Sequence, residues 1–444
     1  MALKHEPWLQ LSAGLDNELR QAGEEGRIID AQLEAEIKEV VAMPDGKEKN
    51  ARAHELFDRV QACECPNDAK EPSALSDIQA LRPGTPITKA PDADTTYDKI
   101  YGGWLGRASG CLLGKPLEGW RSKNMHAFFK LTDNYPLSRY VSSDVPVELF
   151  LQAELKDYEY TNRAFINTVD CMPEDDDTNY TLIALRLIET AGRNFTPDDV
   201  AECWLRNLPL LHLCTAERVA YRNITMGYDP SESATVMNTY REWIGAQIRA
   251  DLFGYVNPGN TAMAAEMAWR DASISHVKNG IYGEMWVAAM IAAAFCTDDV
   301  LAVIEAGLSE IPPESRLTLA IRDVIAWWKE GVSADDVFAR IHARWDENNS
   351  HDWCHTISNA QIVAYALLYG EKNFERTLSL AVSAALDTDC NGATAGSVLG
   401  VMLGAKALPE KWIAPLNDSL ESGVDGFGRV KISDMASRTM KLLG

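Results

Sequence analysis

Two regularly spaced runs of glycine constrain the fold of this chain more than any other feature. Glycines stand at positions 102, 106, 110 and 114, and again at 392, 396, 400 and 404. A spacing of four places each run on one face of a helix, although an interior glycine costs up to about 1 kcal/mol relative to alanine. The pattern therefore predicts two helices with which another backbone is in very close contact, and tight helix packing alone is enough to explain it.

Charged residues flank both glycine runs, which favours a soluble core over a membrane span. The longest apolar segment, residues 285–295, is too short to cross a bilayer and is predicted to be a buried helix. The N-terminal sequence lacks the continuous apolar stretch of a secretory signal, and nine scattered cysteines argue against a disulfide framework. We therefore expect a cytoplasmic protein with no membrane partner.

Composition sets the size of the core and excludes one class of partner. The 444 residues are 46% hydrophobic, which is ample for a large core. Acidic residues exceed basic ones by 65 to 42, giving a formal net charge of -23. Because such a charge repels polyanions and the sequence has no local basic patch, we expect no nucleic-acid partner.

Helical periodicity dominates the chain from Tyr97 onward, and alternating strand patterns are scarce. Four segments begin at acidic or asparagine caps and repeat apolar residues every three or four positions: 198–211, 298–311, 334–345 and 373–386. The sequence thus predicts an all-α, compact multi-helix bundle.

Residues 1–94 differ from the remainder and are predicted to be an N-terminal helical extension with a linker. Residues 30–62 are typical of two charged amphipathic helices separated at Pro44, and residues 65–96 are typical of an extended connector. We expect this extension to pack on the main body, residues 95–444, or to mediate contacts between chains. We predict no chemistry in it.

Two acidic clusters carry the chemical prediction. Asp175, Asp176 and Asp177 precede one apolar helical run, and Asp387 and Asp389 precede the second glycine run. A single aspartate at such a place is an ordinary helix cap, but five exceed what capping requires. Oxygen-rich sites of this kind bind Mg²⁺, and two neighbouring ions can activate water. The alternative is two separately capped helices.

At these motifs the chain resembles the ADP-ribosylglycohydrolase family, which includes the dinitrogenase reductase-activating glycohydrolases. The family pattern G-x-P-x-E is matched by "GKPLE", the pattern [S/T]-D-D-T by "DDDT", and the pattern D-T-D-x-N-A by "DTDCNGA". A looser match to G-N-G-x-A-M-R, with a histidine step after it, lies at 258–283. The four motifs occur in the family order across about residues 97–405.

The resemblance implies an all-α hydrolase that uses two Mg²⁺ ions to cleave a glycosidic bond of ADP-ribose or of an ADP-ribosylated substrate. The implied metal ligands are the five aspartates, with Asp389 as the bridge between the ions. Glu118 and Asp177 are the implied catalytic residues. The implied substrate-binding residues are Gly259, Asn260 and His276, to which the polar position Asn359 is added as a residue predicted to line the cleft.

Three departures from the family patterns leave alternatives open. Asp175 replaces a serine or threonine, Cys390 replaces a threonine, and Ala264 replaces the arginine that closes the central loop. More negative charge and a missing cation favour a less anionic substrate, so a glycosidase or nucleosidase acting on a neutral sugar is an alternative. Mn²⁺ or Ca²⁺ are alternative ions. A non-enzymatic, crystallin-like binding protein is a third hypothesis.

A separate metal site is suggested by His351 and His355, which stand four residues apart with Cys354 between them. Such a pair on a helix can bind zinc, but no accompanying glutamate motif supports that interpretation. His276 is more often found as a packed histidine than as a catalyst. No histidine neighbours Cys390 in the sequence, which argues against a nucleophilic cysteine.

Overall fold

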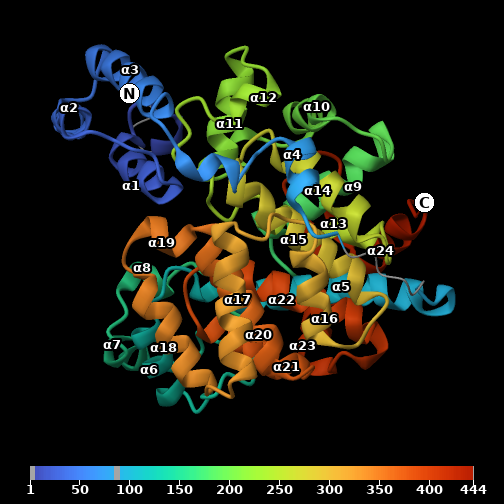
Figure 1. The fold of residues 1–444 in the computed structure, drawn as a ribbon. Helices are drawn as coiled ribbons and strands as arrows, with labels where there is room; N and C mark the ends of the chain where they lie inside the picture. Colours follow the sequence, from blue (N-terminus) through green and yellow to red (C-terminus); the bar gives the residue numbers. More distant parts are fainter. Residues whose placement is uncertain (1–5, 85–90, 444) are drawn as a thin grey trace.

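A computed structural model describes residues 6–84 and 91–443, and these are mostly α-helix (Figure 1). The α-helices of the main body are α5 (Ala93–Gly114), α6 (Ser122–Leu131), α7 (Val147–Gln152), α8 (Asp157–Tyr160), α9 (Asp176–Ala191), α10 (Pro197–Asn207), α11 (Thr215–Thr225), α12 (Pro230–Ser233), α13 (Asp251–Tyr255), α14 (Thr261–Ala272), α15 (Lys278–Ala294), α16 (Val300–Leu308), α17 (Arg316–Lys329), α18 (Ala334–Arg344), α19 (Ser350–Cys354), α20 (Thr356–Gly370), α21 (Phe374–Ser383), α22 (Thr388–Leu403), α23 (Glu410–Ile413) and α24 (Ile432–Met440). The short 3-10 turns are η2 (Pro7–Leu9), η3 (Pro66–Ala69), η4 (Lys115–Leu117), η5 (Leu210–His212), η6 (Gln247–Arg249), η7 (Ala405–Ala407) and η8 (Ala414–Leu416).

The two glycine runs lie in α5 and α22, and these helices pack against each other along their glycine faces (Figure 1). A Cβ atom added at Gly106 would overlap the carbonyl oxygen of Gly396, and one added at Gly110 would overlap that of Gly392. The predicted close approach of backbones is confirmed, and each glycine run supplies the partner of the other. This contact brings the ends of two distant segments of the chain together.

Two of the four predicted helices begin at the expected acidic or asparagine caps, and the other two begin at a threonine and a serine just before the predicted segments. Asp299 caps α16 and Asn373 caps α21 with side-chain oxygens, whereas Thr196 caps α10 and Ser333 caps α18. A capping oxygen accepts a hydrogen bond from a first-turn N–H group that would otherwise have no partner. The four helices predicted from these segments are therefore confirmed.

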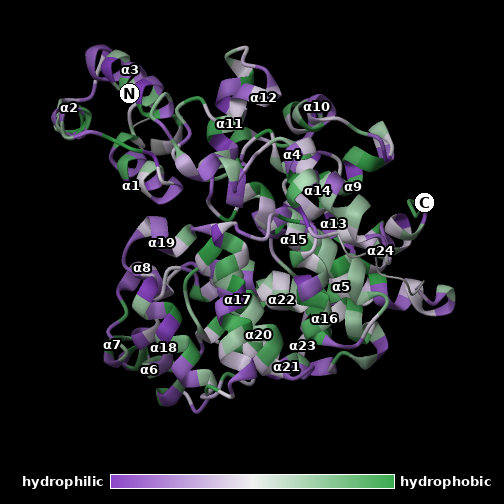
Figure 2. Cartoon of the chain, viewed as in Figure 1, coloured by the Kyte–Doolittle hydropathy of each residue, from purple (hydrophilic) through white to green (hydrophobic). Residues whose placement is uncertain are grey.

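The centre of the body is the apolar helix α15, in which every residue is buried. Hydrophobic residues are concentrated in α15 and the helices around it, while the outer helices mix polar and apolar residues (Figure 2). The predicted buried helix over 285–295 is thus confirmed. No described helix is both long enough and apolar enough to cross a membrane.

Strand structure among the described residues is a single small hairpin. β1 (Ser419–Ser422) pairs antiparallel with β2 (Gly428–Lys431), with Ser419 opposite Lys431. An isolated bridge between Met172 and Leu420 attaches the hairpin to the loop before α9. The all-α prediction is confirmed, and the nine cysteines form no disulfide among the described residues.

The N-terminal extension forms its own small helical layer, made of α1 (Leu15–Glu25), α2 (Ala31–Val41) and α3 (Lys47–Gln61). It has a separate apolar cluster, to which the body contributes Met237. The break near Pro44 is as predicted. The connector is less extended than expected, because α4 (Leu75–Leu81) forms within it and buries Ile78 in the main core. Residues 85–90 of that connector lie outside the described residues.

Candidate functional site

The starts of α9 and α22 open into one cleft with a volume of about 840 Å³. Asp175 and Asp176 line the cleft at α9, and Asp387 and Asp389 line it at α22. Glu118 lines the same cleft just after the turn that ends α5. Acidic residues about two hundred positions apart in the sequence therefore share one cavity.

A strained turn places the second acidic pair. Ala385 and Leu386 have φ values of 58° and 56°, in the left-handed region that residues with a Cβ atom rarely adopt. They reverse the chain between α21 and α22 so that Asp387 follows immediately. The hydroxyl of Thr388 then donates to the carbonyl of Gly114 at 3.0 Å, which ties this turn to the end of α5. Strain of this kind is concentrated at functional sites.

The first acidic group is organised by the start of α9. The Asp175 side chain caps the helix by accepting from the backbone N–H of Asp177 at 2.9 Å. The positive end of the helix dipole then faces the carboxylates and favours their charged forms. Capping therefore accounts for one aspartate of the three and leaves the other two without this explanation.

The carboxylates of the two groups are close to one another. Oxygens of Glu118, Asp387 and Asp389 lie within 4.8 Å of one another, as do those of Asp177 and Asp389 together with the sulfur of Cys390. At such distances two carboxylates repel strongly unless a cation lies between them or one of them is protonated.

Built-in cations neutralise only part of this charge. The Nζ of Lys115 lies 2.7 Å from Asp175, and Arg107 binds Asp177 at 3.2 Å. Within residues 6–84 and 91–443, no ion pair reaches Asp176, Asp387, Asp389 or Glu118. The Oδ1 atom of Asp389 is buried and has no hydrogen-bond partner.

The pKa values of these groups reflect the excess of negative charge. Burial, with Asp175 and Asp389 nearby, raises the pKa of Asp176 to about 8. Burial and the Asp389 carboxylate raise the pKa of Asp387 well above its usual range. The Asp389 carboxylate is the main cause, and burial the second, of a pKa of Glu118 that is also raised well above its usual range. The side chain of Glu118 opens into the cleft. A divalent cation among these oxygens would favour the charged carboxylates and so oppose all three shifts.

The donor set suits a hard cation. Carboxylate oxygens are the ligands that Mg²⁺, Mn²⁺ and Ca²⁺ prefer. The two thiols beside the cluster, Cys111 and Cys390, are buried, and burial raises their pKa values well above the usual range for thiols. The carboxylate oxygens around them outnumber these two sulfur atoms, which favours a hard cation over a soft one. The residues present therefore fit a divalent ion held by oxygen, with Asp176, Asp387 and Asp389 as the ligands that lack another cation.

Asp177 lies behind the cleft wall rather than on it. It is fully buried and is absent from the residues that line the cleft. Arg107 holds its carboxylate and also binds Asp251 at 2.7 Å. Its distance to Asp389 leaves a role as a metal ligand open, but its burial does not favour direct contact with a substrate, which a catalytic residue requires.

Asn359 also lies outside the cleft, contrary to the expectation that it would line the wall. Its Oδ1 accepts from the backbone N–H of Asp387 at 3.2 Å and from the side chain of Asn391 at 2.8 Å. Its Nδ2 donates to the carbonyls of Trp353 and His355 at 3.0 and 2.9 Å. The amide is fully used by the protein and holds the 387–391 turn in place.

Three further residues predicted to contact substrate do not line the cleft. Gly259 donates its N–H to Ala292 near the end of α15, and the side chain of Asn260 caps α14. His276 is fully buried, with Nδ1 2.8 Å from the hydroxyl of Ser275. Asparagine is also a common cap of an ordinary helix, and Asn260 is one. A match of this stretch to the G-N-G-x-A-M-R pattern therefore does not distinguish a substrate loop from a helix cap.

Comparison with known proteins identifies the domain around this cleft. The sequence profile described as ADP-ribosylglycohydrolase matches residues 92–443. The chain belongs to the ADP-ribosylglycohydrolase family. A solved structure titled "ADP-ribosylglycohydrolase-related protein complex" is 18% identical and superposes with a TM-score of 0.52, covering 79% of this chain and 98% of that chain. That likeness supports the shared fold, and no curated protein matches this chain.

Family membership supports a glycohydrolase activity and clarifies the central loop. Trp243, Ile244, Gly245 and Ile248 line the cleft where the loop at 259 does not. In the stretch 243–249, "WIGAQIR", the glycine and the arginine have the spacing of the second glycine and the arginine in G-N-G-x-A-M-R. Arg249 therefore matches, in its spacing from Gly245, the arginine for which Ala264 stands in the stretch at 258–283.

Arg249 does not face a substrate. It is buried and binds Glu217 at 2.7 Å, while Asp271 holds its other side and Glu284 lies 3.7 Å away. Three carboxylates therefore surround this buried guanidinium and balance its charge within the protein. Arg249 therefore has a structural role, in which its ion pair holds the side chain of the cleft residue Glu217.

Sequence analysis also missed the contribution of the N-terminal extension. Trp8, Ala13, Asp16, Asn17 and Arg20 line the same cleft as the acidic residues. Their sequence carries no motif that would have identified them. Their position depends on how the extension docks, which involves partners more than two hundred residues away.

Proposed function

We propose that this protein is a divalent-metal-dependent hydrolase that cleaves a glycosidic bond of ADP-ribose or of an ADP-ribosylated compound. The observation that carries the proposal is the convergence of Asp176, Asp387, Asp389 and Glu118 in one cleft, where none of the four has an ion pair among the described residues. Membership of the ADP-ribosylglycohydrolase family supports the reaction class.

Asp176, Asp387 and Asp389 are the residues that would hold the ions, with Asp175 and Asp177 beside them. When bound, two Mg²⁺ or Mn²⁺ ions would supply a Lewis-acidic centre that polarises a sugar hydroxyl and makes water more acidic. Asp389 is the best candidate for a shared ligand, because it is close to both Glu118 and Asp177 and has one buried oxygen without a partner.

Glu118 is the proposed proton donor and acceptor. It opens into the cleft, and its carboxyl group lies within 4.8 Å of oxygens of Asp387 and Asp389, so that in its protonated form it can deliver a proton to a substrate bound at these carboxylates. It gives this proton to the leaving group as the bond to the anomeric carbon breaks, and water then adds to that carbon and loses a proton to a carboxylate. The nearby carboxylates stabilise the positive charge that develops on the sugar ring.

A glycosidase acting on a neutral sugar is the second candidate. Eight carboxylates line the cleft, namely Asp16, Glu118, Glu174, Asp175, Asp176, Glu217, Asp387 and Asp389, against the two permanent cations Arg20 and Lys115. This excess of negative charge disfavours a substrate with several phosphates unless the ions compensate for it. Substrate charge is therefore the property that separates the two candidates.

The test is an assay of protein stripped with EDTA and then supplied with Mg²⁺, Mn²⁺ or Ca²⁺. A panel of ADP-ribosylated compounds is compared with neutral nitrophenyl glycosides. The proposal expects turnover of an ADP-ribosylated compound only after metal is restored. Metal-independent turnover would contradict it, and turnover of the neutral glycosides alone would favour the second candidate.

A further inference from the structure

One wall of the proposed catalytic cleft comes from outside the family domain. The family profile begins at residue 92, yet Trp8, Asp16, Asn17 and Arg20 line the cavity that contains Asp389. In Figure 1 the N-terminal layer lies beside the main body, with α1 next to α19. The extension, for which the sequence predicts no chemistry, is thus part of the site.

Buried ion pairs fix α1 in this position. Arg241 binds Glu18 at 2.8 Å and Glu25 at 2.7 Å, and all three side chains are at most 1% exposed. The Nε2 of Gln21 donates to the carboxylate of Glu242 at 2.7 Å. Because removing one partner of a buried ion pair leaves an uncompensated charge, such contacts specify a single docked position.

These anchors are adjacent to cleft residues in the chain. Arg241 follows Tyr240 and precedes Trp243, both of which line the cleft. On the other side Arg20 forms an ion pair with Asp352, whose neighbour Trp353 also lines the cleft. Docking of α1 therefore supplies one wall of the cleft and also fixes the two neighbouring walls, which contain Trp243 and Trp353.

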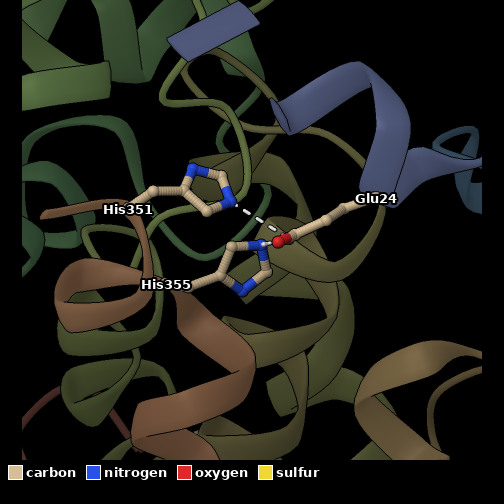
Figure 3. A group of neighbouring side chains, drawn as sticks. All are labelled: Glu24, His351 and His355. Carbon is tan, nitrogen blue, oxygen red and sulfur yellow. Dashed lines mark hydrogen bonds and ion pairs between the residues drawn. The ribbon is translucent and has the colours of Figure 1, made fainter. Parts of the chain in front are cut away.

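A third anchor joins Glu24 to His351 and His355 (Figure 3). The Oε2 of Glu24 lies 3.0 Å from the Nε2 of His351 and 3.5 Å from the Nε2 of His355. Two histidines and a glutamate this close to one another form a candidate zinc site.

Hydrogen bonds on the far side of each ring exclude that assignment. The indole N–H of Trp243 donates to Nδ1 of His351 at 3.1 Å, and the backbone N–H of Ile357 donates to Nδ1 of His355 at 3.1 Å. Both Nδ1 atoms are therefore unprotonated, so the proton of each neutral ring is on Nε2. His351 donates this proton to Glu24, whereas Nε2 of His355 lies 3.5 Å from the same carboxylate without a hydrogen bond. A metal-bound histidine instead donates its other N–H to an acceptor. Glu24, His351 and His355 therefore form a carboxylate–histidine contact, called the clasp below, that holds α1 on the main body.

The cleft beside the extension is lined by Trp8 and Asp16 of the extension and by Tyr240 and Trp243 of the main body. Trp8 rests on the guanidinium of Arg218, 4.7 Å from its ring centre, and Trp243 packs edge-on against Tyr240. Asp16 is exposed to the cleft, and no ion pair reaches it in the described part of the chain. Flat aromatic faces and a free carboxylate suit an aromatic heterocycle with N–H donors, such as a nucleobase.

We propose that residues 8–20 are a substrate-binding wall, in which Trp8 and Asp16 contact a nucleobase-type group of the substrate while its glycosidic bond lies at the carboxylates around Asp389. This assignment rests on the proposed function. It makes the N-terminal extension a determinant of specificity rather than an accessory layer.

The test compares Trp8→Ala and Asp16→Ala with Asp58→Ala. Asp58 is an exposed aspartate on α3 that does not line the cleft, so it is a matched control. Three probes are titrated into each protein: Mn²⁺ alone, ADP-ribose with Mn²⁺, and ribose 5-phosphate with Mn²⁺. Thermal unfolding is recorded to confirm that each variant folds.

We expect Mn²⁺ to bind all four proteins with the same affinity. ADP-ribose should bind about ten-fold more weakly to Trp8→Ala and about five-fold more weakly to Asp16→Ala, because both lose a contact with the base. Ribose 5-phosphate, which has no base, should bind all proteins equally, and Asp58→Ala should behave as wild type.

Two failures can be told apart. If wild type binds ADP-ribose but Trp8→Ala and Asp16→Ala bind it with unchanged affinity, the substrate-binding wall is refuted while the proposed function stands. If wild type binds neither Mn²⁺ nor ADP-ribose, the proposed function is refuted, and the assignment of residues 8–20 as a substrate-binding wall is refuted with it. Equal weakening of ribose 5-phosphate would also overturn the assignment, because the contact would then not be with the base.

Discussion

The acidic residues at the start of α9 and those at the start of α22 line one cleft but differ in how their charge is balanced. At α9, Asp175 is bound by Lys115 and Asp177 by Arg107. At α22, neither Asp387 nor Asp389 has an ion pair in the described part of the chain. Two of the three carboxylates at α9 are thus paired with cations of the protein itself, whereas Asp176 and both carboxylates at α22 have no such partner among the described residues.

The cations of the α9 group come from α5, the helix that also packs against α22. Arg107 lies in α5, and Lys115 follows its last glycine. One helix therefore balances the first acidic group and positions the second. The carboxylates without such a partner, Asp176, Asp387 and Asp389, are those to which the proposed function assigns the ions.

The most severe way to break this arrangement is to separate α5 from α22. In Gly110→Val the new side chain would overlap the backbone of Gly392, so we expect a loss of about 3 kcal/mol or more in unfolding free energy. Urea denaturation measures it. Gly23→Ala in α1 is the control: no atom lies within 4 Å of its added Cβ, and we expect a gain of about 0.5 to 1 kcal/mol. Equal behaviour of the two variants would refute the close contact.

The next largest effect is expected at the α22 group. Asp389→Asn keeps the size of the side chain but removes a charge, so we expect kcat/KM to fall on the order of a thousand-fold. Asp299→Asn is the matched control, because asparagine caps α16 as well as aspartate does and Asp299 is outside the cleft. Steady-state kinetics on the best substrate measures kcat/KM for both variants. A fall of less than ten-fold in Asp389→Asn would count against Asp389 as a metal ligand.

The α9 group is tested by removing its cation. In Lys115→Met the carboxylate of Asp175 loses its partner, so we expect the metal-free protein to lose about 3 kcal/mol of stability. Divalent ions should then raise the melting temperature more than they do in wild type, because they replace the missing charge. Thermal unfolding with and without Mn²⁺ measures both effects. A metal response equal to that of wild type would show that the two groups are not electrostatically linked.

A smaller effect is expected from the clasp on α1. Burial lowers the pKa of His355 to about 3, well below its unfolded value of about 6.5. Between these values the unfolded chain binds a proton that the folded chain does not, so stability falls as pH drops from about 6.5 to 3. His355→Gln should reduce this slope by up to about 1.4 kcal/mol per pH unit.

Urea unfolding at pH 4 to 7 measures the slope. Beside His355 lie Glu24, His351, Glu242 and Arg316, and none of these is changed by the substitution. His54→Gln, on the exposed face of α3, is the control and should keep the wild-type slope. An unchanged slope in His355→Gln would contradict a buried, neutral histidine.

Much of the fold could be predicted because its determinants are local. A glycine every four residues and a capping residue before an apolar period each fix a helix within a few positions. The acidic clusters were predictable for the same reason. The docking of α1 was not, because it depends on Arg241 and on histidines more than three hundred residues from Glu24.

The misplaced site residues show the limit of pattern matching. Asn359 is a buried polar residue on a helix, and the sequence does not distinguish an amide that binds a ligand from one that holds a turn. Gly259 and Asn260 resemble a family loop but cap an ordinary helix, while Gly245 lines the cleft in a stretch with fewer matching letters. Only the three-dimensional arrangement separates these cases.

Titration calorimetry with Mn²⁺ on EDTA-stripped protein tests the central claim most directly. We predict two bound Mn²⁺ ions per chain in wild type, and binding at least about a hundred-fold weaker in Asp389→Asn. No heat of binding in wild type, or binding of equal strength and stoichiometry in Asp389→Asn, would contradict the conclusion that these carboxylates form a metal centre.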